Sequence, residues 1–148
     1  MKKLLGWREW VAFPELGLPR IKAKVDTGAR TSCLHAFSTQ TFTRGGSRWV
    51  RFAVHPVQGD FKHVVSCEAP VLDQRSVTDS GGHTEQRLVI ASRIVLGAWS
   101  DDIEITLTNR DTMLFRMLLG RTAMIKGGFL VDPARSYLQS TEPVGDAP

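Results

Sequence analysis

The feature that most constrains this 148-residue sequence is a long series of short apolar segments separated by turn signals. Residues 21–25 alternate between polar and apolar side chains, as expected for a strand with one buried face. Glycine-containing turns at residues 44–47 and 79–82 each join two such segments, which is typical of β-hairpins. A helical pattern is confined to residues 121–126, before a pair of glycines. The sequence therefore predicts an all-β fold, a small barrel with one short helix.

The same criteria predict strands along most of the chain. The other expected strands are residues 7–13, 34–42, 49–54, 64–72, 75–78, 85–90, 92–96, 103–108, 115–119, 129–131 and 136–138. No repeat or internal boundary interrupts them, so we expect residues 1–138 to form one domain. Residues 139–148 are polar and contain two prolines, which predicts a flexible C-terminal tail.

Composition limits the classes of partner. No segment approaches the roughly 20 apolar residues of a membrane helix, so no membrane partner is expected. The formal charge is +4, from 19 basic and 15 acidic residues, which by itself gives little support for nucleic-acid binding. Two cysteines, Cys33 and Cys67, cannot form a disulfide framework, and this favours a reducing, cytoplasmic location. Packing is the default role for both thiols.

Four tryptophans keep a second class of function open. They are Trp7, Trp10, Trp49 and Trp99. Such rings can stack on single-stranded nucleic acid, although packing against a sheet is the simpler interpretation. An OB-like binding module with a small barrel therefore stays the weaker alternative.

A candidate catalytic group follows the strand predicted at residues 21–25. That strand leads directly into Asp26-Thr27-Gly28, which places a carboxylate at a strand end beside a glycine whose backbone can bend closely. Aspartic peptidases need this geometry, because two such carboxylates share one proton and hold a water between them. One carboxylate takes a proton from the water while the other polarises the scissile carbonyl. Taken alone, the three residues fit a turn aspartate or a helix N-cap better than a catalytic group.

Two further motifs change this interpretation. The glycine-tipped hairpin follows in mid-chain, and residues 118–121 then read Leu-Leu-Gly-Arg before the predicted helix. In this order the motifs resemble those of the retropepsins, the peptidase fold of retroviral proteases. The resemblance implies a retropepsin-like, single-lobe acid-protease β-barrel that is half of a dimeric aspartic peptidase.

The resemblance is closer to a bacterial family of retropepsin-like aspartic peptidases of the RimB type, once described as ATP-dependent zinc proteases. The motifs that carry it are residues 22–32, 34–36, 105–110, 117–121 and 129–133. Some members are associated with a RimK-type glutamate ligase that adds glutamate tails to a ribosomal protein. The resemblance therefore implies proteolysis of acidic or glutamate-rich tails, with a glutamate-tailed ribosomal protein as a candidate substrate.

The sequence contains one Asp-Thr-Gly, whereas a catalytic pair needs two carboxylates. We therefore expect a homodimer in which each chain contributes Asp26 across a two-fold axis. The resemblance implies that Thr27 hydrogen-bonds across this axis and that Gly28 shapes the loop. A domain that binds peptides or regulates a partner without cleaving them is the alternative, and it would use the same groove.

Cationic residues are the expected selectors of substrate. Retroviral proteases usually place an acidic residue after Asp-Thr-Gly-Ala, where it pairs with the later arginine, but this chain has Arg30. Arg30 and Arg121 therefore need another anion nearby. It could be a substrate carboxylate, which we expect them to select, or an internal partner such as Glu85 or Asp132. These two interpretations carry equal weight.

The mid-chain hairpin supplies the remaining candidate contacts. Its tip is expected to close over the substrate as a flap and exclude water, with an ordinary hairpin as the alternative. The expected contacts are Ala29 from the first motif and Ser80, Gly81, Gly82, His83 and Arg87 from the hairpin.

Metal and cofactor chemistry has little support. A zinc peptidase helix would show His-Glu-x-x-His, which is absent from the sequence. His83 and Glu85 could supply two ligands, but they would need a third from elsewhere. No glycine-rich loop ends in the Gly-Lys-Ser/Thr of an ATP site. We therefore expect no metal and no cofactor.

Overall fold

The structure is a computed structural model that describes residues 3–78, 81–109 and 114–140. Its helices are α1 (Arg121–Gly127) and the short 3-10 helix η1 (Pro14–Leu16). Its strands are β1 (Lys3–Leu5), β2 (Arg8–Phe13), β3 (Leu18–Val25), β4 (Ser32–His35), β5 (Ser38–Arg44), β6 (Ser47–Val54), β7 (Val65–Pro70), β8 (Asp73–Thr78), β9 (Thr84–Leu96), β10 (Trp99–Thr108), β11 (Met117–Leu119) and β12 (Phe129–Val131). No helix in the described ranges is long and apolar enough to cross a membrane.

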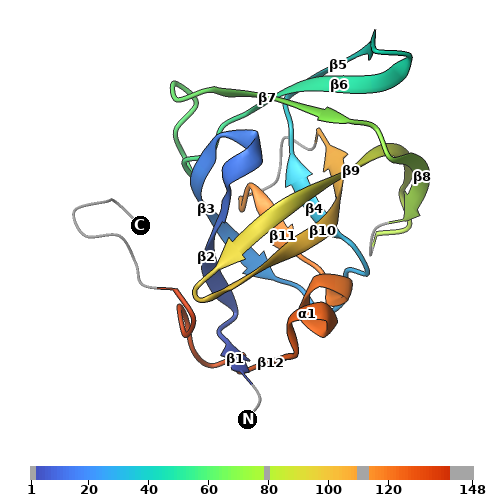
Figure 1. Cartoon of the computed structure of the whole chain (residues 1–148). Coiled ribbons are helices and arrows are strands. Elements are labelled where there is room, and N and C mark those ends of the chain that lie inside the picture. The colour runs from blue at the N-terminus through green and yellow to red at the C-terminus, as the bar shows by residue number, and fades with distance from the viewer. Residues whose placement is uncertain (1–2, 79–80, 110–113, 141–148) are drawn as a thin grey trace.

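A closed barrel forms the body of the molecule (Figure 1). Its strands follow the order β10-β4-β11-β3-β2-β9, and antiparallel pairing of β9 with β10 closes the ring. The barrel is mixed, because β10 pairs with β4 and β11 with β3 in parallel. β8 pairs with β9 outside the ring. The prediction of an all-β barrel with one short helix is confirmed.

The core fills the inside of this barrel. Along each strand every second side chain points inward. In β3 these are Ile21, Ala23 and Val25, and they belong to one buried apolar cluster with Ile105 of β10 and Leu119 of β11. Each fully buried aliphatic side chain stabilises the fold by roughly 2 kcal/mol. The alternation that predicted a strand in the sequence therefore also supplies the packing.

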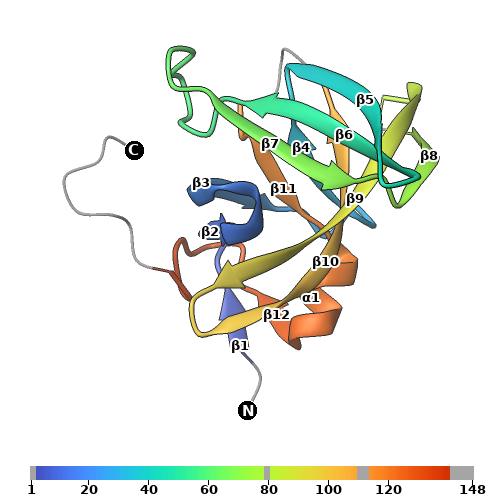
Figure 2. The ribbon, with the colours of Figure 1, turned by 45° about the horizontal axis from the view of Figure 1, so that its top comes forward.

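A second, antiparallel sheet of β5, β6 and β7 lies at the end of the molecule away from β1, β12 and α1 (Figure 2). Val50 and Phe52 of β6 and Cys67 of β7 are buried in the main core cluster. Burial raises the pKa of the Cys67 thiol to about 12. The thiol therefore stays neutral near neutral pH, which fits a packing role rather than a nucleophile.

Residues 34–42 were predicted to form one strand, and this is wrong. They contain the end of β4 and most of β5, which belong to different sheets. The backbone N–H of Ala36 bonds to the Thr108 carbonyl of β10, whereas that of Phe37 bonds to the Ala53 carbonyl of β6. The chain thus changes sheets between two consecutive residues. Residues 85–90 and 92–96, expected as two strands, instead form the single strand β9.

The C-terminal segment also departs from the prediction. Residues 136–138 were expected to be a closing strand, but the segment is irregular and Tyr137 has φ 56°. It lies beside the start of β2, where the Tyr137 N–H donates to the Arg8 carbonyl at 3.0 Å. This placement leaves residues 139 and 140, expected in the tail, against the barrel. Residues 141–148 lie outside the described residues.

Glu9 of β2 fixes this segment from inside the molecule. Its side chain is fully buried. Its carboxylate accepts hydrogen bonds of 2.7–3.1 Å from the backbone N–H groups of Gly6, Leu138, Gln139 and Ser140 and from the Ser140 hydroxyl. Buried polar groups of this kind are stable only when they are fully hydrogen-bonded. The carboxylate therefore joins the two ends of the domain.

Candidate active site

The Asp26-Thr27-Gly28 loop is placed by the order of three strands. β3 and β4 are consecutive in the sequence, but β11 lies between them in the barrel. The chain must therefore cross the end of β11 on its way from β3 to β4. Val25 is the register partner of Leu119, and the Asp26 N–H donates to the Leu119 carbonyl at 2.9 Å. Asp26 thus begins a tight loop at the end of the strand.

Hydrogen bonds within the loop orient the Asp26 carboxylate. The Gly28 N–H donates to Asp26 Oδ1 at 2.9 Å, and the Ala29 N–H donates to the Asp26 carbonyl at 3.2 Å. A Cβ at Gly28 would lie only 3.2 Å from Asp26 Oδ1, so a side chain there would crowd the carboxylate. Asp26 is half-buried, whereas Thr27 and Gly28 are exposed. The loop therefore presents an oriented carboxylate beside exposed backbone.

Gly120 joins the end of β11 to this loop. Its N–H donates to Ser32 Oγ at 3.0 Å in a buried hydrogen bond. A Cβ at Gly120 would lie 2.6 Å from the carbonyl carbon of Thr31, so a larger residue would push the loop away. Ser32 was not among the predicted site residues, because a serine in a strand carries no signal of a contact with so distant a glycine.

Arg121 completes the support of the loop. Its N–H donates to the Ala29 carbonyl at 2.8 Å. Its Nη1 donates to the carbonyls of Thr27 and Gly28 at 3.0 and 3.2 Å. One residue thus holds the loop through both its backbone and its side chain. The structure therefore brings Asp26-Thr27-Gly28 and residues 118–121 together. The Arg121 side chain bonds to carbonyl oxygens of the loop.

The charges around the loop differ from both internal ion pairs that were expected, one with Glu85 and one with Asp132. Among the described residues, no ion pair joins a carboxylate to Arg30 or Arg121, and both residues are exposed. The two carboxylates considered as their partners bind other arginines: Glu85 binds Arg87 and Asp132 binds Arg135. Their selection of an acidic substrate stays a prediction.

A hairpin exists where the flap was expected. β8 and β9 pair in register up to the turn that joins them. Gly81, Gly82 and His83 lie exposed just before β9, and Gly82 has a φ of 83°, which favours glycine. Ser80 lies outside the described residues. Closure of this hairpin over a substrate stays a prediction.

Arg87 lies within β9 rather than at the hairpin tip. Its side chain is 8% exposed, and its Nε donates to Glu85 Oε1 at 2.5 Å. The Thr108 hydroxyl donates to the same carboxylate oxygen at 2.6 Å. Arg87 Nη1 lies 3.5 Å from Cys33 Sγ and from Thr106 Oγ1. Sequence reasoning missed the two threonines, which look like ordinary strand residues.

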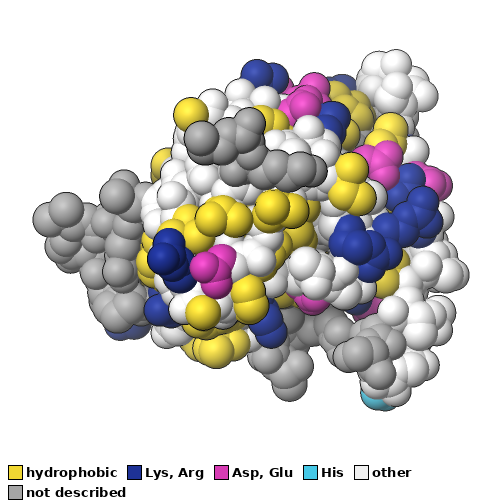
Figure 3. All heavy atoms as spheres, turned by 90° about the horizontal axis from the view of Figure 1, so that it is seen from below, with side chains coloured by type: hydrophobic (Ala, Val, Ile, Leu, Met, Phe, Trp, Pro, Cys, Tyr) yellow, Lys and Arg dark blue, Asp and Glu magenta, His cyan; other side chains and the backbone are white. Residues whose placement is uncertain are grey.

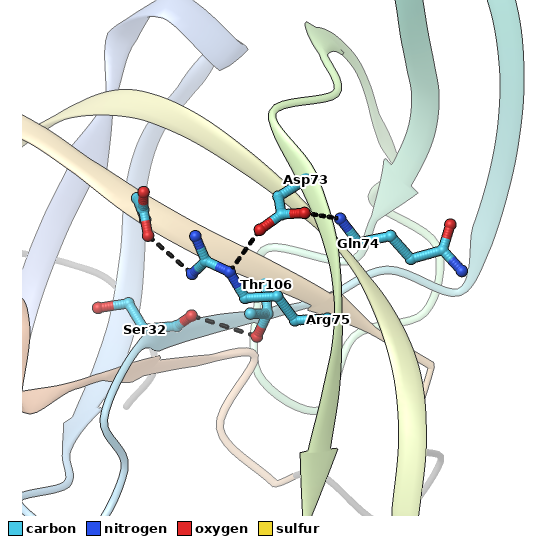
Figure 4. A network of polar contacts seen from close by, with 6 residues as sticks. Ser32, Asp73, Gln74, Arg75 and Thr106 are labelled. Carbon is cyan, nitrogen blue, oxygen red and sulfur yellow. Dashed lines mark hydrogen bonds and ion pairs between the residues drawn. The ribbon is translucent and has the colours of Figure 1, made fainter.

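A second polar network lies nearby (Figure 4). Arg75 of β8 donates to Asp73 and to Glu104 of β10, both at 2.8 Å. The hydrogen bond to Glu104 and then that to Asp73 raise the pKa of Arg75, while the Arg75 contact lowers the pKa of Asp73. Thr106 donates to the Ser32 carbonyl at 3.3 Å in the same region. These contacts tie β8, β10 and β4 to one another.

In the part of the chain that the structure describes, no group of three or more His, Cys, Asp or Glu side chains is placed to hold a metal ion. His55 stacks on Phe37, with ring centroids 4.0 Å apart, and His35 is buried in β4. These two histidines contribute to packing.

The chain is similar in sequence to parts of longer proteins. A probable alpha-L-glutamate ligase from Desulfotalea psychrophila is 52% identical over 133 residues, which are 90% of this chain and 28% of that protein. A protein of the same description from Parasynechococcus marenigrum is 54% identical over 136 residues, which are 92% of this chain and 29% of that protein. The chain therefore spans less than a third of the length of these curated relatives.

A solved structure and a family match agree with the fold. The crystal structure of a protein of unknown function (DUF785) from Legionella pneumophila has a TM-score of 0.79 and 27% identity, over 95% of this chain and 100% of that one. Residues 4–142 match the RimB-like family, described as "Retropepsin-like aspartic endopeptidase RimB". Because this match extends over nearly the whole sequence, the chain belongs to the RimB-like family of retropepsin-like aspartic endopeptidases.

Proposed function

We propose that this chain is an aspartic endopeptidase whose active site forms where two copies bring their Asp26 loops together. The observation that carries the proposal is the supported loop, in which the Gly28 N–H orients the Asp26 carboxylate and Arg121 binds the carbonyls of Thr27 and Gly28. Two such carboxylates share one proton and hold a water between them. One accepts a proton from the attacking water, and the other polarises the scissile carbonyl.

A second copy is needed because one chain supplies one Asp-Thr-Gly. Thr27 is exposed in the single chain, and a two-fold partner would give its side chain a hydrogen-bond partner across the axis. Both copies would then hold their loops in one rigid arrangement. This rigidity favours catalysis, because the reacting groups keep a fixed geometry.

One end of the barrel supports such self-association. α1, β1 and β12 lie together there, and Figure 3 shows apolar side chains gathered on this face. Leu4 is 40% exposed, Leu130 49% and Ile125 75%. Exposed apolar surface of this kind favours contact with another protein surface. Because α1 begins at the Asp26 loop, a two-fold contact on this face would bring the two loops close to each other.

We further propose that the substrates are acidic, glutamate-rich tails in the cytoplasm. Arg30 is exposed next to the loop and is available to attract carboxylates. Relatives of about three times the length are named probable alpha-L-glutamate ligases, which associates domains of this kind with glutamate chemistry. A RimK-type ligase is therefore the candidate functional partner, and a glutamate-tailed ribosomal protein is the candidate substrate.

The test compares the wild type with Asp26→Asn on glutamate-rich and neutral peptides. We expect cleavage by the wild type and a loss of about a thousandfold or more in Asp26→Asn, with peptide binding retained. Asp102→Asn, which changes an exposed carboxylate of β10, is the matched control and should cleave normally. If the wild type and Asp26→Asn bind peptides equally and neither cleaves them, the domain is a peptide-binding or regulatory module instead.

A further inference from the structure

Arg87 is unusual among the arginines of this sheet because its side chain is almost fully buried. It is 8% exposed, whereas Arg75, its register partner on β8, is 38% exposed. Arginine side chains are rarely buried unless they are paired, because removing a charge from water is costly. A buried guanidinium therefore needs a strong anionic partner.

The partners that Arg87 has are incomplete. Its Nε binds one oxygen of Glu85, and the partners of its Nη1 among the described residues are a thiol and a hydroxyl, each at 3.5 Å. Among the described residues, its Nη2 has no hydrogen-bond partner. A guanidinium can bind both oxygens of a carboxylate through two parallel hydrogen bonds. The Arg87 guanidinium therefore keeps donors for a second carboxylate or for a better-aligned one.

The two members of this ion pair differ in their freedom to move. Arg87 is held between β4 and β10, whereas the Glu85 side chain is 43% exposed. Glu85 also lies at the second position of β9, three residues after Gly82 at the hairpin tip. A substrate carboxylate that displaces Glu85 must also replace it at the Thr108 hydroxyl, which donates to Glu85 at 2.6 Å, whereas Arg87 would stay in place. Because Glu85 is the more exposed member of the pair, its position is the one that a ligand from solvent can reach.

The pair also lies close to the Asp26 loop. Arg87 contacts Cys33 and Thr106, which are register partners in β4 and β10. Cys33 is in turn the register partner of Leu118 in β11, one residue before the carbonyl that binds the Asp26 N–H. The guanidinium therefore lies on the barrel wall between the base of the hairpin and the catalytic loop.

We propose that Arg87 binds a carboxylate of the peptide substrate and that Glu85 occupies this position until the substrate displaces it. The proposal rests on the proposed peptidase function, because it assigns Arg87 to the substrate groove of that site. Glu85 then competes with the substrate for Arg87. This competition weakens the binding of acidic peptides and has little effect on the binding of neutral peptides. The ligand is an acidic side chain or a free C-terminal carboxylate.

The experiment measures peptide binding in the Asp26→Asn protein, so that it does not depend on cleavage. The probes are fluorescein-labelled octapeptides of alternating alanine and glutamate, or alanine and glutamine, each with a free or an amidated C-terminus. Glu85→Gln should bind the glutamate peptide about tenfold more tightly and the glutamine peptide equally well. Arg87→Gln should bind both peptides alike. Comparison of the free and the amidated peptides shows whether a glutamate side chain or the C-terminus supplies the carboxylate that binds Arg87.

The matched control is Arg75→Gln, which removes the register partner of Arg87, an arginine that binds the two carboxylates Asp73 and Glu104 (Figure 4). This variant should keep the preference for the glutamate peptide over the glutamine peptide. Because Arg87→Gln could fail to fold, Arg87→Lys and thermal melting accompany it, and Arg87→Lys should reduce the preference without abolishing folding. An unchanged glutamate-to-glutamine ratio in Glu85→Gln overturns the proposal.

The outcome is separable from that of the proposed function. Cleavage by the wild type with no glutamate preference would overturn the role of Arg87 and leave the peptidase standing. A glutamate preference that depends on Glu85 and Arg87, in a protein that cleaves nothing, would support the carboxylate site and overturn the peptidase.

Discussion

Single buried polar side chains decide much of this structure. Glu9 receives five hydrogen bonds, and Ser32 receives the one that fixes Gly120. Each satisfies backbone groups that would otherwise be buried without partners, which would cost about 1–3 kcal/mol per group. Such residues specify one arrangement of the chain more strongly than apolar contacts do, because their geometry is directional.

Glu9→Gln tests this role of a buried carboxylate. The amide keeps one acceptor but replaces the other with a donor that faces backbone N–H groups, so we expect a loss of about 3 kcal/mol in the free energy of unfolding. Urea denaturation measures it. Glu15→Gln is the control, since Glu15 is exposed and accepts one bond from the Arg93 N–H. Equal effects of the two substitutions would contradict the account.

Residues of the site differ in how far the sequence could predict them. Asp26, Gly28 and Gly120 belong to local motifs, so their chemistry could be recognised from neighbouring residues. Ser32 and Glu9 could not, because their hydrogen-bond partners lie 88 residues or as many as 131 residues away in the sequence. Only the fold brings these pairs together.

Among the elements, the placement of β11 between β3 and β4 matters most for the site. It forces the Asp26 loop to cross a strand end, where Gly120 and the first turn of α1 hold it. The loop is therefore rigid because three elements support it. Its own three residues provide one internal bond to the carboxylate.

Ser32→Ala tests this support. It leaves the buried Gly120 N–H without its acceptor, so we expect a loss of about 1–2 kcal/mol in stability and about tenfold in kcat, with KM little changed. Ser92→Ala is the control, because Ser92 is a buried barrel serine whose hydroxyl bonds only to the Arg93 carbonyl among the described residues. A similar loss of kcat in both variants would show that general stability, and not loop support, is responsible.

The elements themselves were predicted best where pairing is local. The β5–β6 and β8–β9 hairpins join neighbouring segments, so turn residues and alternation were sufficient to indicate them. The change of sheet between β4 and β5 was missed, because it depends on hydrogen bonds to β10 and β6. The irregular segment at Tyr137 was missed because its path depends on a hydrogen bond to Arg8, at the start of β2.

At the scale of the whole molecule, one chain completes the barrel but supplies only one carboxylate of the proposed catalytic pair. The ring of strands closes within one chain, whereas the proposed catalytic pair needs a second Asp26 from another. The exposed apolar residues of α1, β1 and β12 offer a surface for that second copy. Activity should therefore fall on dilution as the dimer dissociates, and the part of the stability that comes from association should fall with it.

The central claim is that two Asp26 carboxylates, one from each copy, make one active site. It is tested most directly by mixing wild-type and Asp26→Asn chains at constant total concentration, after exchange of subunits, and measuring peptide cleavage. Random pairing with one dead subunit per mixed dimer predicts that the rate falls as the square of the wild-type fraction. A rate that falls in direct proportion to that fraction would mean that each chain acts alone, and would contradict the account.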